Sequence, residues 1–439
     1  MKKSFPKVFP SFIQIEGLSG ILLFSVTILA MIWANSPYAD SYHALWDYDL
    51  GLDFETFNLV KPTILWVNDG LMAIFFFLIG LEIKRELLIG ELNSIRKATF
   101  PIFAALGGMF VPLTLFLLLN TNPETNPGWG IPMATDIAFS LAILNILGRY
   151  VPMSLKVFLT AFAIVDDLGA VLVIAFFYNH GISWLLLGIA IALLGLLFFL
   201  SYKGYYSKYL TLILGVVIWI LFLKSGIHPT IAGVLLAFTV PIRRKIDIPT
   251  FIREIDIIED KIVHAHNDST ELLSDEQIKQ IDYLEYVIDK AQSPLQRLEH
   301  RLHGWVAYLI MPIFALANAG ITFSADMEFE LPLILNICIA LLVGKVIGIP
   351  LFSYASIKLN LAELPENLNF QHIIGVAILA GVGFTMSIFI ANLAFESNPA
   401  FSGSAKVGVL LGSSIAAIFG ALILRLNGAG RKRNEAAGS

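Results

Sequence analysis

The sequence predicts an all-α integral membrane protein with twelve transmembrane helices. Of its 439 residues, 57% are hydrophobic and 14% are charged, whereas about a quarter of the residues in a typical soluble domain are charged. The apolar residues gather in runs that approach the ~20 residues a helix needs to cross a bilayer. These runs lie at 17–34, 62–84, 97–119, 129–147, 153–177, 182–201, 206–223, 227–241, 303–322, 331–354, 371–394 and 405–425.

The basic residues between these runs support the count of twelve. Lys and Arg gather in the cytoplasmic segments of membrane proteins. When both termini are placed inside, only Lys61, Lys224 and Lys406 of the 29 Lys and Arg residues fall outside, and Lys345 lies within a span. With an odd number of spans, the basic residues would no longer separate into a large inner set and a small outer set. We therefore expect both termini in the cytoplasm.

The eighth and ninth spans are joined by the one long hydrophilic segment, residues 246–296. It carries twelve acidic and four basic side chains. Within it, residues 274–292 have apolar side chains at helical spacing, and Ser274 with Gln277 can form a capping box. We expect a small, helical cytoplasmic insert, which either regulates the protein or only extends the loop.

Residues 45–60, which follow the first span on the outside, alternate apolar and polar side chains around Gly51. This pattern is typical of a short β-hairpin on the outer surface, and an ordered polar loop is the alternative. The chain is thus expected to divide into 1–245 with eight spans and the hairpin, the insert 246–296, 297–428 with four spans, and a cytoplasmic tail at 429–439.

Several ionisable residues lie where lipid is expected. Asp136, Asp166, Asp167 and Lys345 are in the middle of spans, and Asp69 and Glu82 are nearer the ends of the second span. Each mid-membrane charge costs roughly 2.5–3.5 kcal/mol on insertion scales. Ion pairs that only hold helices together are the structural alternative, but three acids cannot all pair with one base. Unpaired carboxylates within a membrane usually mark a path for ions or protons.

The adjacent residues Asp166 and Asp167 cannot both face one ligand, because neighbours on a helix point about 100° apart. We expect one to face an ion cavity and the other a neighbouring helix, where Lys345 is the mid-membrane cation available to it. Carboxylate oxygens suit hard cations. A low dielectric and a like charge nearby both favour the neutral, protonated carboxyl group. Such a site holds either Na⁺ or a proton, and it exchanges them if it faces each side of the membrane in turn.

Two spans contain residues that interrupt helices. The stretch "GIPMATDIAFS" (130–140) places Pro132 in the fourth span, just before Thr135 and Asp136. The stretch "LAGVGFTMSIF" (379–389) places Gly381, Gly383 and Thr385 in the eleventh. Each signal is weak alone, but the two spans hold matching places, in the middle of spans 3–5 and of spans 10–12. Paired broken helices at corresponding positions are typical of an inverted-repeat transporter, because unwound backbone is tolerated where it lines a wet cavity.

Half-helices that meet at such breaks carry dipoles that need charge compensation. Asp136 is placed to neutralise two facing helix N-termini. Lys345 is placed to do the same for two facing C-termini, in addition to pairing with an aspartate.

Several stretches of the sequence, including those around the mid-membrane charges, resemble a known family, the NhaA-type bacterial sodium/proton antiporters. The matching stretches are "GLEIKREL" (80–87), "ATDIAFSLAIL" (134–144), "VDDLGA" (165–170), "KSGIHPTIAGV" (224–234), "RLEHRLHGWVAYLIMPIFALANAG" (297–320), "LLVGKVIGI" (341–349), "ELPENLNFQ" (363–371) and "GFTMSIFIANLAF" (383–395). The resemblance covers nearly the whole chain apart from 246–296. It implies NhaA-like inverted repeats in which spans 4 and 11 are unwound and cross.

The resemblance also implies roles for individual residues. Asp167 is implied as the principal ion- and proton-binding carboxylate, with Na⁺ held at Asp166 and Asp167, and Asp166 as the partner of Lys345. Thr135 and Asp136 match residues at the helix crossing. The cytoplasmic mouth associated with pH sensing is matched by Glu82, Arg85, Glu299, His300 and His303, although charges solvated at a membrane edge are the alternative. Asp69 and His228 match accessory residues on the outer side.

The implied function is electrogenic exchange of Na⁺ or Li⁺ for protons, activated at alkaline pH, for pH and sodium homeostasis. Such a protein is a secondary active transporter rather than an enzyme. It needs no cofactor and binds no nucleic acid. We expect a multi-pass protein of the bacterial inner membrane, in contact with lipid, that forms a homodimer through the outer hairpin.

Two other functions share part of this pattern. An intramembrane aspartyl protease needs its two aspartates on different helices to share a water, whereas here they are adjacent and a Gly-x-Gly-Asp stretch is absent. A sodium-coupled symporter for an organic anion also uses broken helices. The combination of Asp166, Asp167 and Lys345 favours proton exchange, because a symporter needs no such proton-binding set.

Overall fold

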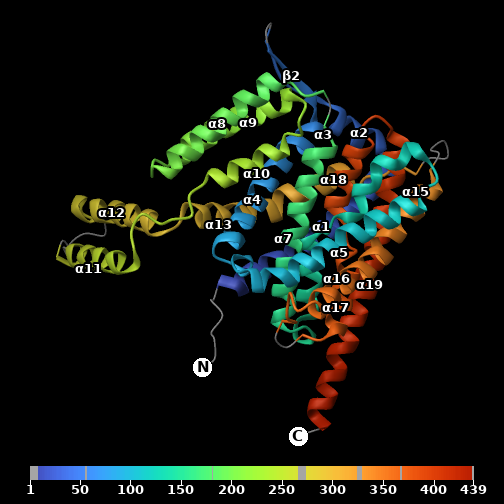
Figure 1. Ribbon diagram of the computed structural model, residues 1–439. Helices are drawn as coiled ribbons and strands as arrows, with labels where there is room; N and C mark the ends of the chain where they lie inside the picture. Colours follow the sequence, from blue (N-terminus) through green and yellow to red (C-terminus); the bar gives the residue numbers. More distant parts are fainter. Residues whose placement is uncertain are drawn as a thin grey trace.

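In the described part of the chain, the architecture is all-α apart from one β-hairpin (Figure 1). The computed structural model describes residues 8–54, 57–179, 181–264, 273–323, 329–365 and 368–437. Its first half contains α1 (Val8–Ala34), α2 (Ala39–Asp47), β1 (Asp49–Phe54), β2 (Phe57–Pro62), α3 (Thr63–Leu65), the π-helical turn η1 (Trp66–Leu71), α4 (Met72–Leu88), η2 (Glu91–Asn93), α5 (Ile95–Leu119), the 3-10 helix η3 (Pro123–Met133), α6 (Ile137–Leu147), η4 (Gly148–Tyr150), α7 (Met153–Phe177), α8 (Trp184–Tyr202), α9 (Lys208–Ser225) and α10 (Thr230–Thr239).

The second half begins with the predicted insert. It contains α11 (Ile248–His264), α12 (Asp275–Ala291), α13 (Pro294–Trp305), the π-helical turn η5 (Val306–Ile310), α14 (Met311–Asn318), α15 (Leu331–Ile339), the π-helical turn η6 (Ala340–Gly344), α16 (Lys345–Lys358), α17 (Phe370–Ala380), α18 (Phe384–Ala394) and α19 (Pro399–Ala437). Helix therefore occupies every one of the twelve apolar runs.

Seven helices of the described chain are long and apolar enough to cross a membrane, or up to ten when each bent pair is taken as one span. These lengths confirm an all-α, multi-pass membrane protein, while the number twelve stays a prediction. The bent pair α1 and α2 turns by 110°, so α2 does not extend the first span. The predicted eighth span contains α10, whose ten residues are short for a crossing.

The two interrupted spans are bent at the predicted places. The axes of η3 and α6 differ by 43°, and those of α17 and α18 by 45°. The first half of the fourth span is a 3-10 helix rather than an α-helix. Gly383 is required where the breaks approach each other, because a Cβ atom there would lie 2.1 Å from Ser387 Oγ and 3.0 Å from the carbonyl oxygen of Ala134.

Glycines also allow neighbouring helices to touch backbone to backbone. A Cβ atom on Gly107 of α5 would lie 2.1 Å from the carbonyl oxygen of Gly348 on α16, and the reverse distance is the same. A Cβ atom on Gly233 of α10 would lie 2.2 Å from the carbonyl oxygen of Ala73 on α4. Small residues at helix contacts are typical of membrane proteins, because close packing takes the place of the hydrophobic effect.

The segment after α2 folds as an antiparallel hairpin, with pairs running from Asp49 opposite Pro62 to Phe54 opposite Phe57. The hairpin and the end of α19 lie at opposite ends of the molecule (Figure 1). Gly51 has φ +156°, and a Cβ atom there would lie 2.0 Å from the carbonyl oxygen of Leu59, which explains why the alternation is centred on a glycine.

The hydrophilic insert holds the two helices α11 and α12, which project to one side of the bundle (Figure 1). The capping box of Ser274 and Gln277 is confirmed at the start of α12. The ends of the insert are held together, because the backbone nitrogens of Lys245 and Ile246 both donate to the carbonyl oxygen of Lys290. The next helix, α13, begins at Pro294, inside the predicted segment, and its residue Leu295 is fully buried.

Candidate ion-binding site

The breaks in the two bent spans lie against each other. The backbone nitrogen of Asp136 donates to the carbonyl oxygen of Val382 over 2.7 Å, and Thr135 Oγ1 donates to the carbonyl oxygen of Ala380 over 3.1 Å. Ser387 Oγ on α18 donates back to the carbonyl oxygen of Ile131 over 2.8 Å. Each break thus satisfies backbone groups that the other leaves without a helical partner, as buried polar groups require.

Asp136 lies at the N-termini of two half-helices. Its Oδ1 accepts the backbone nitrogen of Phe139 on α6 over 3.0 Å. Its Oδ2 accepts both the backbone nitrogen and the hydroxyl of Thr385 on α18, over 3.1 and 2.5 Å. The side chain is 2% exposed. A carboxylate at a helix N-terminus is stabilised by the unpaired N–H groups and by the helix dipole, and here one carboxylate serves two helices.

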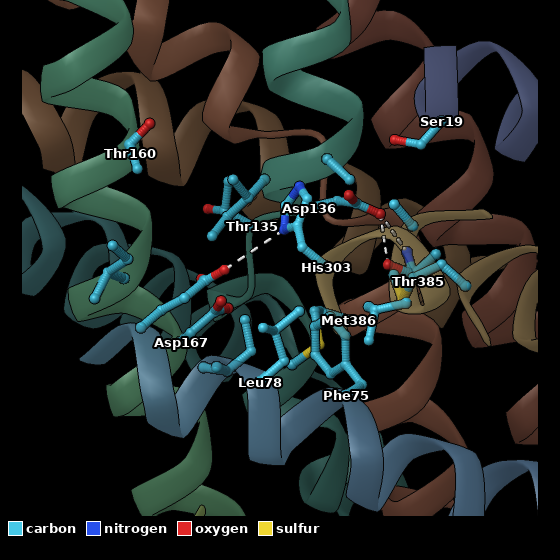
Figure 2. A pocket seen from close by; sticks show the side chains of 18 residues that line it. Ser19, Phe75, Leu78, Thr135, Asp136, Thr160, Asp167, His303, Thr385 and Met386 are labelled. Carbon is cyan, nitrogen blue, oxygen red and sulfur yellow. Dashed lines mark hydrogen bonds and ion pairs between the residues drawn. The ribbon is translucent and has the colours of Figure 1, made fainter. Parts of the chain in front are cut away.

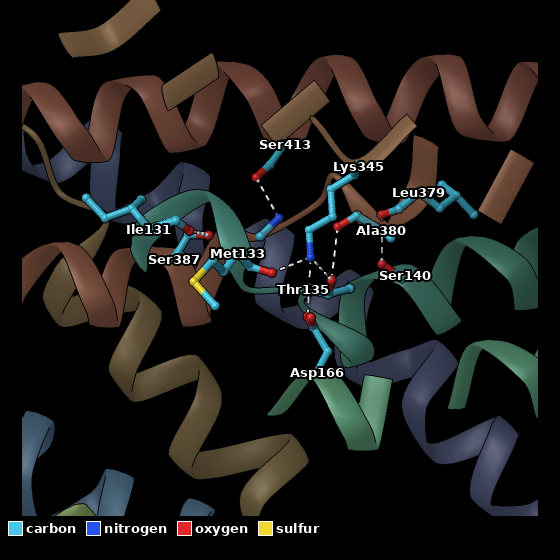
Figure 3. Close-up of polar contacts among 11 residues, drawn as sticks. Ile131, Met133, Thr135, Ser140, Asp166, Lys345, Leu379, Ala380, Ser387 and Ser413 are labelled. Atoms are coloured by element: carbon cyan, nitrogen blue, oxygen red, sulfur yellow. Dashed lines mark hydrogen bonds and ion pairs between the residues drawn. The ribbon is translucent and has the colours of Figure 1, made fainter. Parts of the chain in front are cut away.

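Lys345 occupies the opposite position, at the ends of the two preceding half-helices (Figure 3). Its fully buried Nζ donates to the carbonyl oxygen of Met133, the last residue of η3, and to Thr135 Oγ1 over 2.8 Å. Thr135 in turn donates to Ala380, the last residue of α17. The same ammonium group forms an ion pair with Asp166 Oδ2 over 3.3 Å.

Asp167 faces a cavity instead. The cavity is about 60 Å³ in volume, whereas a single water molecule needs ~10–15 Å³ on the same measure. Among the predicted site residues, Asp167, Asp136, Thr135, Glu82 and His303 line it, and Asp166 does not (Figure 2). The Asp167 side chain is 3% exposed, and no described residue forms a hydrogen bond or ion pair with its carboxylate.

One end of the cavity is formed by residues of α4 and α13. His303 Nδ1 lies 3.8 Å from Glu82 Oε1, and Arg85 contacts both Glu299 and Glu86 over 3.0 Å. Glu299 lies before the predicted span 303–322. Burial raises the pKa of Glu299 to about 7. The nearby carboxylates of Glu82 and Glu86 also raise this pKa, whereas the Arg85 guanidinium lowers it. Of the residues predicted for this end, Glu82 and His303 line the cavity, whereas Arg85, Glu299 and the exposed His300 do not.

The two predicted accessory residues meet elsewhere. Asp69 in η1 forms an ion pair with Lys61 over 3.0 Å and lies 3.8 Å from His228 Nε2. Asp69 is not among the residues that line the cavity, so the structure separates this cluster from Asp167.

Sequence reasoning did not include Thr385 among the site residues, although the Gly-rich stretch 379–389 contains it. Its two hydrogen bonds to Asp136 come from a residue 249 positions away. Thr160 and Ser19 also line the cavity without having been predicted. The described residues contain no cluster of three or more His, Cys, Asp or Glu side chains of the kind that holds a resident metal ion.

Broken helices packed around buried charges and a small cavity define a multi-pass membrane protein with the architecture typical of ion transporters. Comparison with known protein families gives the same class of protein. The family profile described as Na+/H+ antiporter 1 matches residues 10–424. The chain therefore belongs to the Na+/H+ antiporter 1 family.

Individual relatives cover almost the whole chain. The Na(+)/H(+) antiporter NhaA of Oleidesulfovibrio alaskensis is 48% identical over 98% of this chain and 96% of its own length. The protein of the same name from Wolinella succinogenes is 44% identical over 97% of this chain and 94% of its own. Among solved structures, the sodium proton antiporter MjNhaP1 from Methanocaldococcus jannaschii aligns with a TM-score of 0.45 and 12% identity, over 96% of this chain and 98% of that one.

Proposed function

We propose that this protein is a secondary active transporter that expels Na⁺, or Li⁺, in exchange for protons. The family and the names of its relatives support Na⁺/H⁺ exchange. We further propose that exchange is electrogenic, is activated at alkaline pH, and serves pH and sodium homeostasis. No cofactor is needed, because the transported ions themselves carry the chemistry.

The observation that carries the proposal is the position of Asp167. Its carboxylate lines a cavity of about 60 Å³ within the membrane region, and no described residue offers it a hydrogen bond or ion pair. A buried carboxyl group is most stable when it is protonated or when a cation is bound to it. A proton and Na⁺ therefore compete for the same oxygens, and each displaces the other.

Two of the surrounding charges, Asp136 and Lys345, hold the helix ends of the site together. Asp136 is saturated by donors from α6 and α18, and Lys345 holds the carbonyl end of η3. Electrogenic exchange needs a titratable group in addition to Asp167, because one proton for one Na⁺ moves no net charge. Asp166, which precedes Asp167 on α7, forms an ion pair with Lys345 on α16, and this pair supplies the additional titratable group.

The remaining features of the proposal concern the membrane. We place the protein in the bacterial inner membrane. The distribution of Lys and Arg supports an orientation with both termini in the cytoplasm. The hairpin of β1 and β2 is proposed as the contact between two copies in a homodimer. Glu82, Arg85, Glu299, His300 and His303 are proposed to form the cytoplasmic mouth and to respond to pH.

The test is Asp167→Asn in everted membrane vesicles, with a dye that reports the internal pH. An amide cannot trade a proton for a cation, so sodium-dependent dequenching should be lost. Asp282→Asn, an exposed aspartate of the insert, is the control and should exchange like the wild type. Undiminished exchange in Asp167→Asn would refute the assignment, and stimulation of sodium flux by an organic solute would favour a symporter.

A further inference from the structure

Two buried asparagines and a third, partly buried one form a hydrogen-bonded cluster that the ion site does not use. Asn318 Nδ2 donates to Asn68 Oδ1 over 2.8 Å, and Asn392 Nδ2 donates to Asn318 Oδ1 over 2.6 Å. The three residues come from α14, η1 and α18. Asn318 is 2% exposed. Burying amides is unfavourable unless they are hydrogen-bonded, so a cluster drawn from three separate segments of a membrane protein is a candidate for a specific role.

The spans that supply the asparagines also line the cavity, and each asparagine lies on the side away from Glu82 and His303. Along the second span, Asn68 is separated from Glu82 by roughly 20 Å of helix at ~1.5 Å per residue. Along the ninth span, Asn318 is separated from His303 by a similar length. On α18, Thr385 lines the cavity and Asn392 follows about two turns later.

A layer of aromatic rings separates the cavity from the asparagines. Phe389 of α18 packs against Phe76 of α4, with ring centroids 5.6 Å apart, and against Phe314 of α14 at 6.2 Å. All three rings are at most 1% exposed. The cavity is thus closed at this end first by apolar rings and then by amides, all on the same three spans.

We propose that Asn68, Asn318 and Asn392 form a latch that keeps the cavity closed on the side opposite Glu82 and His303. This inference rests on the proposed function, because a latch is needed only where one ion site faces each side of the membrane in turn. Asn392 separates from Asn318 when the site opens to that opposite side.

The hydrogen bonds within the cluster indicate where it separates. Asn68 and Asn318 exchange two hydrogen bonds, over 2.8 and 3.4 Å, whereas a single bond joins Asn392 to Asn318. Asn392 lies on α18, whose first turn holds Asp136 at the ion site. Movement of the ion site therefore carries Asn392 with it. Amides suit this position because they are neutral, so they can exchange partners with water without trapping a cation.

The test is a reversible crosslink between positions 318 and 392. The double variant Asn318→Cys/Asn392→Cys is made in a Cys338→Ser background, which removes the single native thiol. The purified protein is reconstituted in liposomes and treated with a short bis-methanethiosulfonate reagent. Na⁺/H⁺ exchange should fall at least tenfold and should return to its starting rate when a reductant breaks the link.

The matched control is another asparagine pair with the same contact. Asn120, directly after α5, donates from Nδ2 to Oδ1 of Asn126 in η3 over 2.7 Å. Asn120→Cys/Asn126→Cys, linked by the same reagent, should exchange at the rate of its reduced form. A comparable loss there would show that the reagent inhibits unspecifically, and the latch would lose its support.

Sodium-triggered proton release from the protein in detergent separates the two proposals. The crosslinked 318–392 protein should still release protons when Na⁺ is added, because the link lies on the side of the cavity away from Glu82 and leaves Asp167 unchanged. Exchange that persists after crosslinking, with proton release intact, would overturn the latch alone. No proton release even from the reduced protein would overturn the proposed function and the latch with it.

Discussion

Asp166 and Asp167 are consecutive on α7, yet their carboxylates have different surroundings. Asp166 Oδ2 lies 3.3 Å from Lys345 Nζ, whereas Asp167 lines the cavity. The difference follows from the ~100° rotation between neighbouring helix positions. One turn of helix therefore presents one carboxylate to a fixed cation on α16 and the other to the cavity, and these two positions lead to separate predictions.

Lys345→Ala should lose both stability and transport. The substitution leaves Asp166 without its ion pair and the carbonyl oxygen of Met133 without a donor. Removing one partner of a buried ion pair costs about 3–5 kcal/mol, so the midpoint of thermal unfolding in detergent should fall clearly. Lys358→Ala, at the exposed end of the same helix, should melt like the wild type. A Lys345→Ala protein that melts normally would refute both the pairing and the dipole role.

Thr385→Val should weaken the hold on Asp136 while keeping the shape of the side chain. The hydroxyl bond to Asp136 is lost, but the backbone nitrogen of residue 385 still donates. A hydrogen bond to a charged group contributes about 1.5–3 kcal/mol, so unfolding should require correspondingly less free energy and exchange should slow. Thr385→Ser restores the donor and should behave nearly like the wild type. Equal behaviour of the two variants would show that the hydroxyl is unimportant.

Glu299→Gln should flatten the pH dependence of stability. Burial raises the pKa of Glu299 to about 7 from its ordinary value of 4.5. Between these values the folded protein binds a proton that the unfolded chain has lost, so the free energy of unfolding decreases as pH rises through this window. At ~1.4 kcal/mol per pKa unit the loss is roughly 3 kcal/mol. Glutamine does not titrate, so the loss should disappear.

The measurement is thermal unfolding of both proteins at pH 5 and pH 8. The wild type should lose more stability between the two values than Glu299→Gln does. Glu285→Gln, on the exposed surface of α12, controls for the loss of one carboxylate. Parallel pH curves for the wild type and Glu299→Gln would show that Glu299 is ionised well below neutral pH.

Removal of residues 248–289 should leave exchange intact. This deletion spares Lys290, whose carbonyl oxygen closes the base of the insert, and Leu295, which is buried in the core. It removes Asp289, the ion-pair partner of Arg297 on α13. The dye assay in everted vesicles should show normal sodium-dependent dequenching. Complete loss of exchange would mean that the insert is part of the transport machinery.

Much of the fold was predictable because it depends on local pattern. Apolar runs identify helices, and Pro132, Gly381 and Gly383 mark the two breaks, since both effects act within a few residues of backbone. The alternation around Gly51 identified the hairpin for the same reason. The 110° turn between α1 and α2 and the 3-10 winding of η3 were not predicted, because they depend on how the whole bundle packs.

The candidate site was predictable only as a set of residue types. An aspartate within an apolar run is visible because its insertion is unfavourable, and this cost identified Asp136, Asp166 and Asp167. The orientation of Asp167 rather than Asp166 toward a cavity is not encoded in any local pattern. The same holds for Thr385, whose partner Asp136 lies 249 positions away.

By itself, the sequence determined the class of protein, the approximate spans and the charges that a membrane would not accept without a function. Those properties depend on the transfer of side chains and short helices into lipid, which is additive along the chain. Only the tertiary structure decided which oxygens meet Lys345, which carboxylate lines the cavity and which asparagines join three spans. Those contacts link residues far apart in sequence, and they exist only after the helices have packed.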